Sequence, residues 1–107
     1  MAASITDEPQ ALWGRDLRYL LTTHLIERGP LTTARLVELV EAEGFAFSGR
    51  PSKAVADALR WEIARGRVER TGRGRYEFRG TSRSTAWRIR TRVQALRRQA
   101  TPSRLSL

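Results

Sequence analysis

Residues 55–70 read VADALRWEIARGRVER, and this stretch decides the fold. Apolar residues recur in it at the three- and four-residue spacing of an amphipathic helix, and we expect all four to be buried: Val55, Ala58, Leu59 and Ile63. Because Arg50 precedes a proline and so avoids the helical region, the helix begins at position 51 or 52. Gly66 ends it, and from Val68 onward apolar and charged residues alternate, which predicts a strand.

A second alternating segment follows a glycine-rich turn. Tyr76 and Phe78 alternate with charged residues, and Thr71-Gly72-Arg73-Gly74 separates them from the first segment. Two alternating segments joined by such a turn predict a β-hairpin over residues 67–79, with arginine at its tip.

A first helix is predicted from leucines at helical spacing. We expect it to enter through residues 6–9, to carry Leu12 and Trp13 on its apolar stripe and to end at Gly29.

A second helix follows, and Thr32 is well placed to cap its amino-terminal end. Gly44 ends this helix, and Phe45 and Phe47 are expected to enter the core from the next loop.

A last helix is expected at residues 85–100, after a polar joint that follows Gly80. Its apolar residues step by three and four along a two-heptad seam, namely Ala86, Ile89, Val93, Leu96 and Ala100. Two heptads are short for an independent coiled coil, so three uses stay open. In the first, the seam docks on the same chain. In the second, it joins a second copy of the chain as a homodimer contact. In the third, the seam packs against the domain while the surrounding arginines lie along phosphates.

Together these elements predict a mainly α chain with a small β-hairpin, of the α+β class. Residues 1–80 would form the domain with its amino-terminal leader, residues 81–100 a basic carboxy-terminal helix and residues 101–107 a flexible tail.

Three short helices followed by a two-stranded hairpin resemble the winged helix-turn-helix superfamily of DNA-binding domains, over residues 10–79. The stretch quoted first is similar to its pattern of a recognition helix, a glycine stop and a valine that starts the wing. Glu62 and Arg67 depart from that pattern, since leucine and an apolar residue are common there, and we expect Ile63 and Trp61 to take over the packing. The resemblance implies a bacterial regulator or nucleoid-associated protein, and it favours the homodimer use of the last helix.

The charge of the chain is divided sharply at residue 50. The first 49 residues hold four arginines and seven acidic residues, a net charge of −3, whereas the remaining 58 hold sixteen basic and four acidic residues, a net charge of +12. An evenly solvated surface would not divide in this way. The basic half is typical of a protein that binds a polyanion, most often nucleic acid.

The amino-terminal part of the helix at residues 51–65 is the expected reading element, since a major groove about 12 Å wide admits one helix. Its candidate DNA-binding residues are Arg50, Ser52, Lys53, Ala56, Asp57 and Arg60. Small Ala56 permits close approach, Arg50 and Arg60 suit forked contacts to guanine, and Ser52 suits a phosphate at the helix end. Asp57 is expected to pair with Arg60 or Lys53 rather than with cytosine.

Arginines outside that helix complete the candidate interface. Arg70, Arg73 and Arg75 lie on the hairpin, where the turn suits insertion into the minor groove or a clamp on the flanking phosphates. Arg88 and Arg92 on the last helix are added as candidate phosphate contacts.

Several classes of function are not expected. The chain has no cysteine and one histidine, His24, which we interpret as structural or solvated, so neither a metal site nor a cofactor is predicted. No carboxylate is paired in a recognisable catalytic arrangement, and no small-molecule pocket or membrane segment is evident. The chain is therefore expected to be no enzyme and to act in the cytoplasm, at the nucleoid.

Three functions stay open after these exclusions. The main interpretation is a transcriptional regulator that reads double-stranded DNA, favoured by the small and polar residues on the outer face of the helix at residues 51–65. Arginines outside that helix favour a nucleoid-architectural protein of low specificity. The third alternative is an RNA- or ribosome-associated module.

Overall fold

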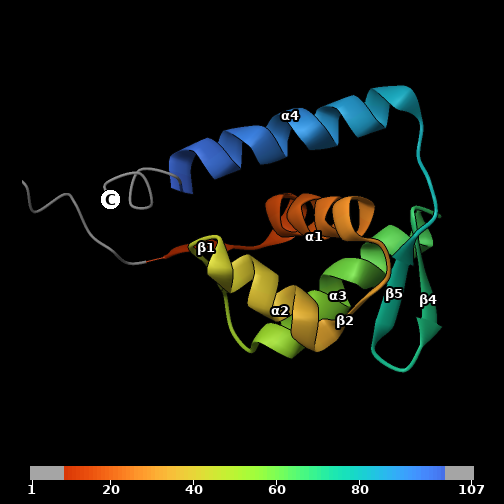
Figure 1. Ribbon diagram of the computed structural model, residues 1–107, viewed down its shortest axis with the longest axis horizontal. Helices are drawn as coiled ribbons and strands as arrows, with labels where there is room; N and C mark the ends of the chain where they lie inside the picture. The colour runs from red at the N-terminus through yellow and green to blue at the C-terminus, as the bar shows by residue number, and fades with distance from the viewer. Residues whose placement is uncertain (1–8, 101–107) are drawn as a thin grey trace, which may run out of the picture.

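Four helices and five short strands make up residues 9–100, the part of the chain that the computed structural model describes (Figure 1). In chain order they are β1 (Gln10–Leu12), α1 (Gly14–Arg28), β2 (Leu31–Thr32), α2 (Thr33–Ala42), β3 (Phe45–Phe47), α3 (Pro51–Ala64), β4 (Val68–Gly72), β5 (Arg75–Phe78) and α4 (Arg83–Ala100). The expected α+β class, mainly helical with a small β part, is confirmed. The expected leader at residues 1–8 and tail at residues 101–107 lie outside the described residues.

The chain enters α1 through a strand rather than through a longer helix, which corrects the expected start. Strand β1 pairs in parallel with β3, with Leu12 opposite Phe47. Leu12 is therefore buried from a strand, whereas Trp13, expected on the apolar stripe, precedes the helix and is 69% exposed. Phe45 is buried as expected, but from β3 and not from a loop. Strands of three residues are too short for their alternation to be detected.

The predicted hairpin is present and gains a third strand. Strands β4 and β5 pair antiparallel, with Val68 opposite Phe78, and β2 pairs with the other edge of β5, with Leu31 opposite Tyr76. Val68 and Tyr76 are buried, so one side of the hairpin packs on the core. Strand β2 has only two residues, and no sequence signal indicated it.

The start of α2 is capped as predicted. Thr32 has an extended backbone, and its side-chain Oγ1 accepts a hydrogen bond from the backbone N–H of Arg35 at 3.1 Å. One of the free amide groups of the first turn is thereby satisfied, which stabilises the start of the helix by about 1 kcal/mol.

Helix α3 is rolled differently from the prediction. Val55, Ala58 and Leu59 are buried as expected, but Ile63 is 38% exposed and Trp61 53% exposed, so neither takes over the core packing. Glu62 fills that place instead and is fully buried. The buried carboxylate is stabilised there by three side chains that interact with its oxygens: Arg18, Thr22 and Arg67.

Helix α4 packs on α1 of the same chain, which decides the use of its seam. Ile89, Val93 and Leu96 are buried in the one core cluster that also holds the leucines of α1. The predicted homodimer contact through Ala86, Ile89, Val93 and Leu96 is therefore not supported, since the last three of these side chains are covered in cis. The helix begins slightly earlier than expected, because Ser82 caps it by accepting from the N–H of Thr85 at 3.2 Å.

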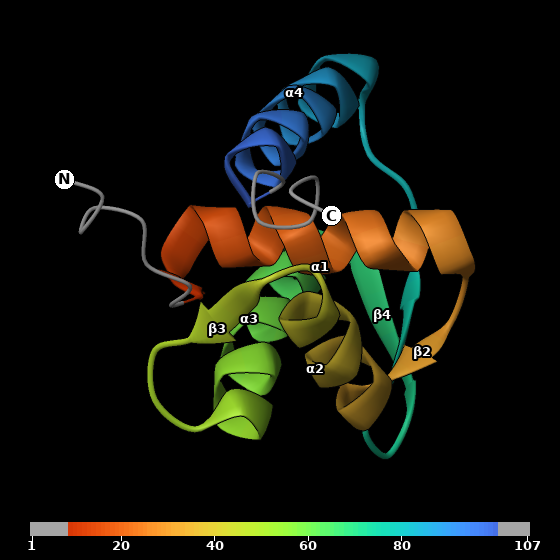
Figure 2. The same ribbon diagram turned by 60° about the vertical axis from the view of Figure 1, so that its left-hand side comes forward.

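Helix α1 lies in the middle of the molecule. Figures 1 and 2 show α4 on one side of α1, and α2 and α3 on the opposite side. The turn of the hairpin and the amino-terminal ends of α2 and α3 lie at the end that faces away from α4. This arrangement places the basic residues of α3 and the hairpin on one surface and those of α4 on another.

Candidate nucleic-acid interface

The amino-terminal end of α3 is formed as the sequence predicted. The helix begins at Pro51, and Arg50 before it has an extended backbone whose carbonyl accepts from the N–H of Ala54 at 2.9 Å. Proline fits this position because it has no N–H to leave without a partner in the first turn. The side chains of Arg50, Ser52 and Lys53 are exposed around this end.

The outer face of α3 carries one aspartate between two cations. Lys53 Nζ donates to Asp57 Oδ2 at 2.7 Å, and Arg60 Nη1 donates to Asp57 Oδ1 at 3.1 Å. The hydrogen bond from Lys53 is the main cause that lowers the pKa of Asp57. The predicted pairing of Asp57 is confirmed with both partners. Exposed pairs of this kind are weak, so a phosphate competes readily with Asp57 for either cation.

The turn of the hairpin is attached to the start of α2. Arg73 and Gly74 form the turn between the paired residues Gly72 and Arg75, and Gly74 has a φ of +65°, which favours glycine. The carbonyl of Gly74 accepts from the backbone N–H of Thr33 at 2.9 Å. Because α2 also packs on α3, this contact holds the turn at a defined place relative to α3.

Three arginines at this end have no acidic partner. Within residues 9–100, no carboxylate lies within ion-pairing distance of Arg50, Arg73 or Arg75, and all three side chains are exposed. Arg70 donates through Nε to the carbonyl of Gly72 at 3.2 Å and is also exposed. Arg50 directly precedes α3, and Arg73 and Arg75 belong to the hairpin turn and the residue after it. Figure 2 shows the start of α3 and this turn at the same end of the molecule, the end that faces away from α4.

Arg88 and Arg92 are not brought to this end. Both belong to α4, which α1 separates from α3 (Figure 1). Arg92 forms a two-point ion pair with Asp16 of α1, at 2.8 and 3.0 Å, and Arg88 donates to Thr85 of its own helix at 3.0 Å. Arg92 thus serves to dock α4, a role that no local pattern in the sequence indicated.

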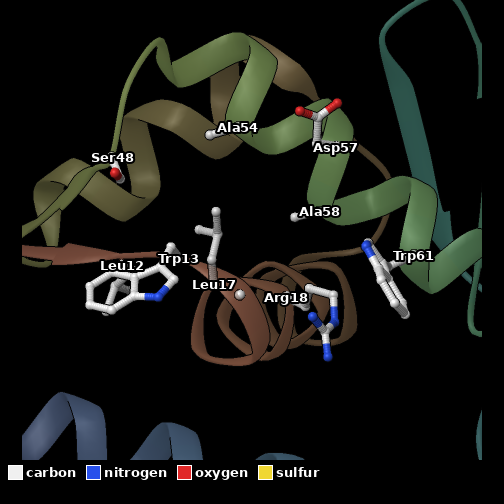
Figure 3. A pocket seen from close by; sticks show the side chains of 10 residues that line it. Leu12, Trp13, Leu17, Arg18, Ser48, Ala54, Asp57, Ala58 and Trp61 are labelled. Carbon is white, nitrogen blue, oxygen red and sulfur yellow. The ribbon is translucent and has the colours of Figure 1, made fainter.

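A hollow of about 240 Å³ borders the outer face of α3 and was not predicted (Figure 3). Trp13 and Trp61 stand at its two ends, with the apolar side chains of Leu17 and Ala58 between them. Arg18 and Arg65 lie over the ring of Trp61, with 5.1 and 4.8 Å between each guanidinium carbon and the ring centroid. Such cation–π contacts explain how a large indole is held at an exposed position.

A larger groove of about 490 Å³ lies between α1 and α4 and was not predicted either. Its apolar lining comes from Ile26, Phe78, Ala86, Ile89 and Val93, and charged and polar side chains border it. The docking of α4 creates this groove, so its residues are far apart in the sequence and gave no joint signal.

His24 belongs to the core. It is buried, and its Nε2 lies 2.8 Å from Oε1 of Glu43, which joins α1 to the end of α2. Within residues 9–100 no group of three or more histidine, cysteine, aspartate or glutamate side chains is placed to hold a metal ion.

No family model matches this chain, and neither a curated protein nor a solved structure is significantly similar to it. Among the described helices, none is long and apolar enough to cross a membrane. The function is therefore inferred from the arrangement of side chains and charges.

Proposed function

We propose that this protein binds double-stranded DNA as a transcriptional regulator of the winged helix-turn-helix type. Helix α3 enters the major groove, and the hairpin of β4 and β5 contacts the minor groove or the phosphates beside it. The observation that carries the proposal is that the start of α3 and the hairpin turn lie at one end of the molecule. The arginines of these two segments, Arg50, Arg73 and Arg75, have no acidic partner among the described residues.

The outer face of α3 suits close approach to base edges. With 14 residues the helix is about 21 Å long, and its amino-terminal half presents exposed Ser52 and Lys53 beside small Ala56. A cation or hydroxyl at this end meets a phosphate or a base edge without having to move a bulky neighbour. Lys53 and Arg60 exchange Asp57 for nucleic acid at little cost, since their ion pairs are exposed.

The hairpin supplies the second contact. Its turn consists of Arg73 and Gly74, and glycine lets the backbone approach the duplex closely while arginine is attracted to the negative potential of the minor groove. The contact between Gly74 and Thr33 limits the freedom of the turn, so less conformational entropy is lost on binding.

The test is a selection of bound duplexes from a random pool at moderate salt, with an RNA pool in parallel. A defined motif among the recovered duplexes supports the regulator. Recovery of RNA without duplex DNA would overturn the proposal, and so would the absence of any recovery. We also expect affinity to fall with salt at a log–log slope of about −5 to −7, for about five to eight phosphates contacted.

Variants at the same surface separate its two elements. Arg73→Ala and Arg75→Ala should weaken binding to all sequences alike, because they remove contacts to the backbone or groove. Lys53→Ala and Arg60→Ala should flatten the sequence preference. Arg88→Ala is the matched control, since it removes one exposed arginine from the far side of α1.

A nucleoid-architectural role of low specificity is the second candidate. The ion pairs on α3 favour this role, because Asp57 binds both Lys53 and Arg60. Arg50 is then the one cation at the start of α3 that has no acidic partner within residues 9–100. Diffuse enrichment of the duplex pool, with tight binding and a steep salt dependence, would identify this role.

A further inference from the structure

Helix α4 carries a strong positive charge, and the ion pairs that dock the helix neutralise only part of it. Its sequence holds six arginines and no acidic residue over 18 positions. Two of the six are anchors: Arg92 pairs with Asp16, and Arg97 pairs with Glu27 at 2.9 Å and with Glu43 at 2.8 Å. The other four have no carboxylate partner within residues 9–100, and all are exposed: Arg83, Arg88, Arg90 and Arg98.

Three of these four arginines lie on one stripe of the helix. Spacings of three and four residues place five exposed side chains along one line, and we call this set the α4 stripe: Arg83, Trp87, Arg90, Gln94 and Arg98. Fifteen residues separate its two ends, so the stripe is about 22 Å long. Arg88 belongs to a different flank of the helix.

The α4 stripe is remote from the candidate interface of α3 and the hairpin. Helix α1 makes its main helical contacts with α4 on one side and α3 on the other (Figure 1). A duplex bound at α3 therefore leaves α4 accessible on the opposite side. The molecule thus has two basic surfaces with its core between them.

We propose that the α4 stripe is a second nucleic-acid surface, which binds the phosphate backbone of a second duplex, so that one molecule bridges two DNA segments. The inference rests on the proposed function, since it assigns a second site for the same class of ligand. A row of guanidiniums that form no ion pair with a carboxylate within residues 9–100 is complementary to a phosphate backbone, and the release of counterions drives their association. Contacts of this kind carry no base specificity.

The composition of the stripe favours nucleic acid over an anionic membrane surface. A helix that lies on a membrane inserts a continuous apolar face. The apolar face of α4 is already buried on α1 through Ile89, Val93 and Leu96, and Trp87 is the one large apolar side chain on the stripe. An exposed indole between arginines suits contact with sugar and base edges at the rim of a groove.

The experiment measures bridging separately from binding. The full chain is mixed with a bead-bound duplex and a labelled free duplex, and the label retained on the beads is counted. Binding of a single duplex is measured by fluorescence anisotropy with protein in excess. We expect the unaltered protein to retain the label on the beads. The triple variant Arg83→Gln/Arg90→Gln/Arg98→Gln should retain about tenfold less label, while its affinity for a single duplex should change by less than about threefold.

Matched variants establish the specificity of this effect. Arg88→Gln removes one arginine from another flank of α4 and should leave bridging unchanged. The triple lysine variant of the stripe should also bridge, since phosphate contacts need the charge rather than the guanidinium. Arg73→Gln/Arg75→Gln should weaken the binding of a single duplex, and bridging should fall with it.

Several outcomes would overturn the inference. Bridging that survives the triple glutamine substitution would show that the stripe is not used, for example because two copies each bind through α3. A chain that binds one duplex and never bridges would likewise refute it, while the proposed function stands. Absence of any duplex binding would refute the proposed function first. Binding to anionic vesicles that the triple variant loses, with bridging intact, would assign the stripe to a membrane surface.

Discussion

Glu62 and Arg67 form a two-point ion pair inside the molecule, with Nε of Arg67 2.7 Å from Oε1 and Nη2 3.1 Å from Oε2 of Glu62. Arg18 Nε lies 3.3 Å from the same carboxylate, and Thr22 donates to it at 3.2 Å. The network joins α1, the end of α3 and the start of the hairpin. The two positions at which the sequence departs from the winged-helix pattern are thus partners of each other.

The Glu62 network should be costly to break on one side. In Glu62→Leu, two largely buried arginines lose their acceptor, and in Arg67→Leu a fully buried carboxylate loses its main donor. We expect each single variant to lower the free energy of unfolding by about 3 kcal/mol, as measured by urea denaturation. The double variant should be more stable than either single one, since the apolar pair then packs without an unmatched charge. If the loss of unfolding free energy in the double variant equalled the sum of the losses in the two single variants, Glu62 and Arg67 would not act as a pair.

Helix α4 should contribute to the core of the single chain. Leu96 is fully buried, so we expect Leu96→Ala to lower the free energy of unfolding by about 2–5 kcal/mol. Trp87→Ala, at an exposed position of the same helix, should change it by less than about 0.5 kcal/mol. Urea denaturation at two protein concentrations decides between packing in cis and assembly, because only the stability of an assembly depends on concentration. A concentration-dependent midpoint would contradict docking in cis.

Acid should loosen the docking of α4. The hydrogen bond from Arg92 lowers the pKa of Asp16, and that from Arg97 lowers the pKa of Glu27. The pKa of Glu43 is lowered as well. Burial alone would raise this pKa, but the interactions of the carboxylate with His24 and Arg97 together outweigh the effect of burial. A carboxyl group with a depressed folded-state pKa stabilises the fold above its unfolded value, and the stabilisation is lost as the pH falls through the folded value. We therefore expect the free energy of unfolding to fall below about pH 4.

The matched variant for the acid prediction is Asp16→Asn. It should be less stable than the unaltered chain at pH 7 and should lose less on acidification, since one of the titrating groups is absent. The measurement is urea denaturation followed by circular dichroism between pH 7 and pH 3. An identical decrease in the variant and the unaltered chain would exclude a contribution from the pair of Asp16 and Arg92.

Asp57 should act against nucleic-acid binding. It holds Lys53 and Arg60 and places a negative charge on the outer face of α3. We expect Asp57→Asn to raise the affinity for all duplexes by several-fold at low salt, with a smaller gain at high salt because charges at the surface are screened. Glu69→Gln is the control, since it removes the acid of the exposed pair with Arg79 near the other end of the hairpin. Weaker binding to selected sequences only would instead assign Asp57 to base recognition.

Local patterns were sufficient for the order of the helices and for the hairpin. The start of α3 at Pro51, the cap at Thr32 and the turn at Arg73 and Gly74 depend on residues within a few positions of one another. The pairing of Asp57 with Lys53 and Arg60 was also predictable, because these residues are one helical turn apart.

The errors arose where partners are distant in the chain. Whether Glu62 or Ile63 points inward depends on Arg18 and Thr22, which lie in another helix and at least 40 positions away in the sequence. The pairing of β1 with β3 and of β2 with β5 likewise joins segments too short to show periodicity. No window of sequence contains both members of these pairs.

By itself, the sequence determined the order of the four helices, the hairpin, the cap of α2, the start of α3 and the concentration of positive charge in the second half of the chain. These properties follow from backbone preferences and side-chain periodicity over a few residues. Only the tertiary structure decided which charges remain unpaired, because Arg92 finds Asp16 across 76 positions whereas Arg73 finds no carboxylate within residues 9–100. An ion pair forms between groups that folding brings within a few ångströms, and that proximity is a property of the packed chain.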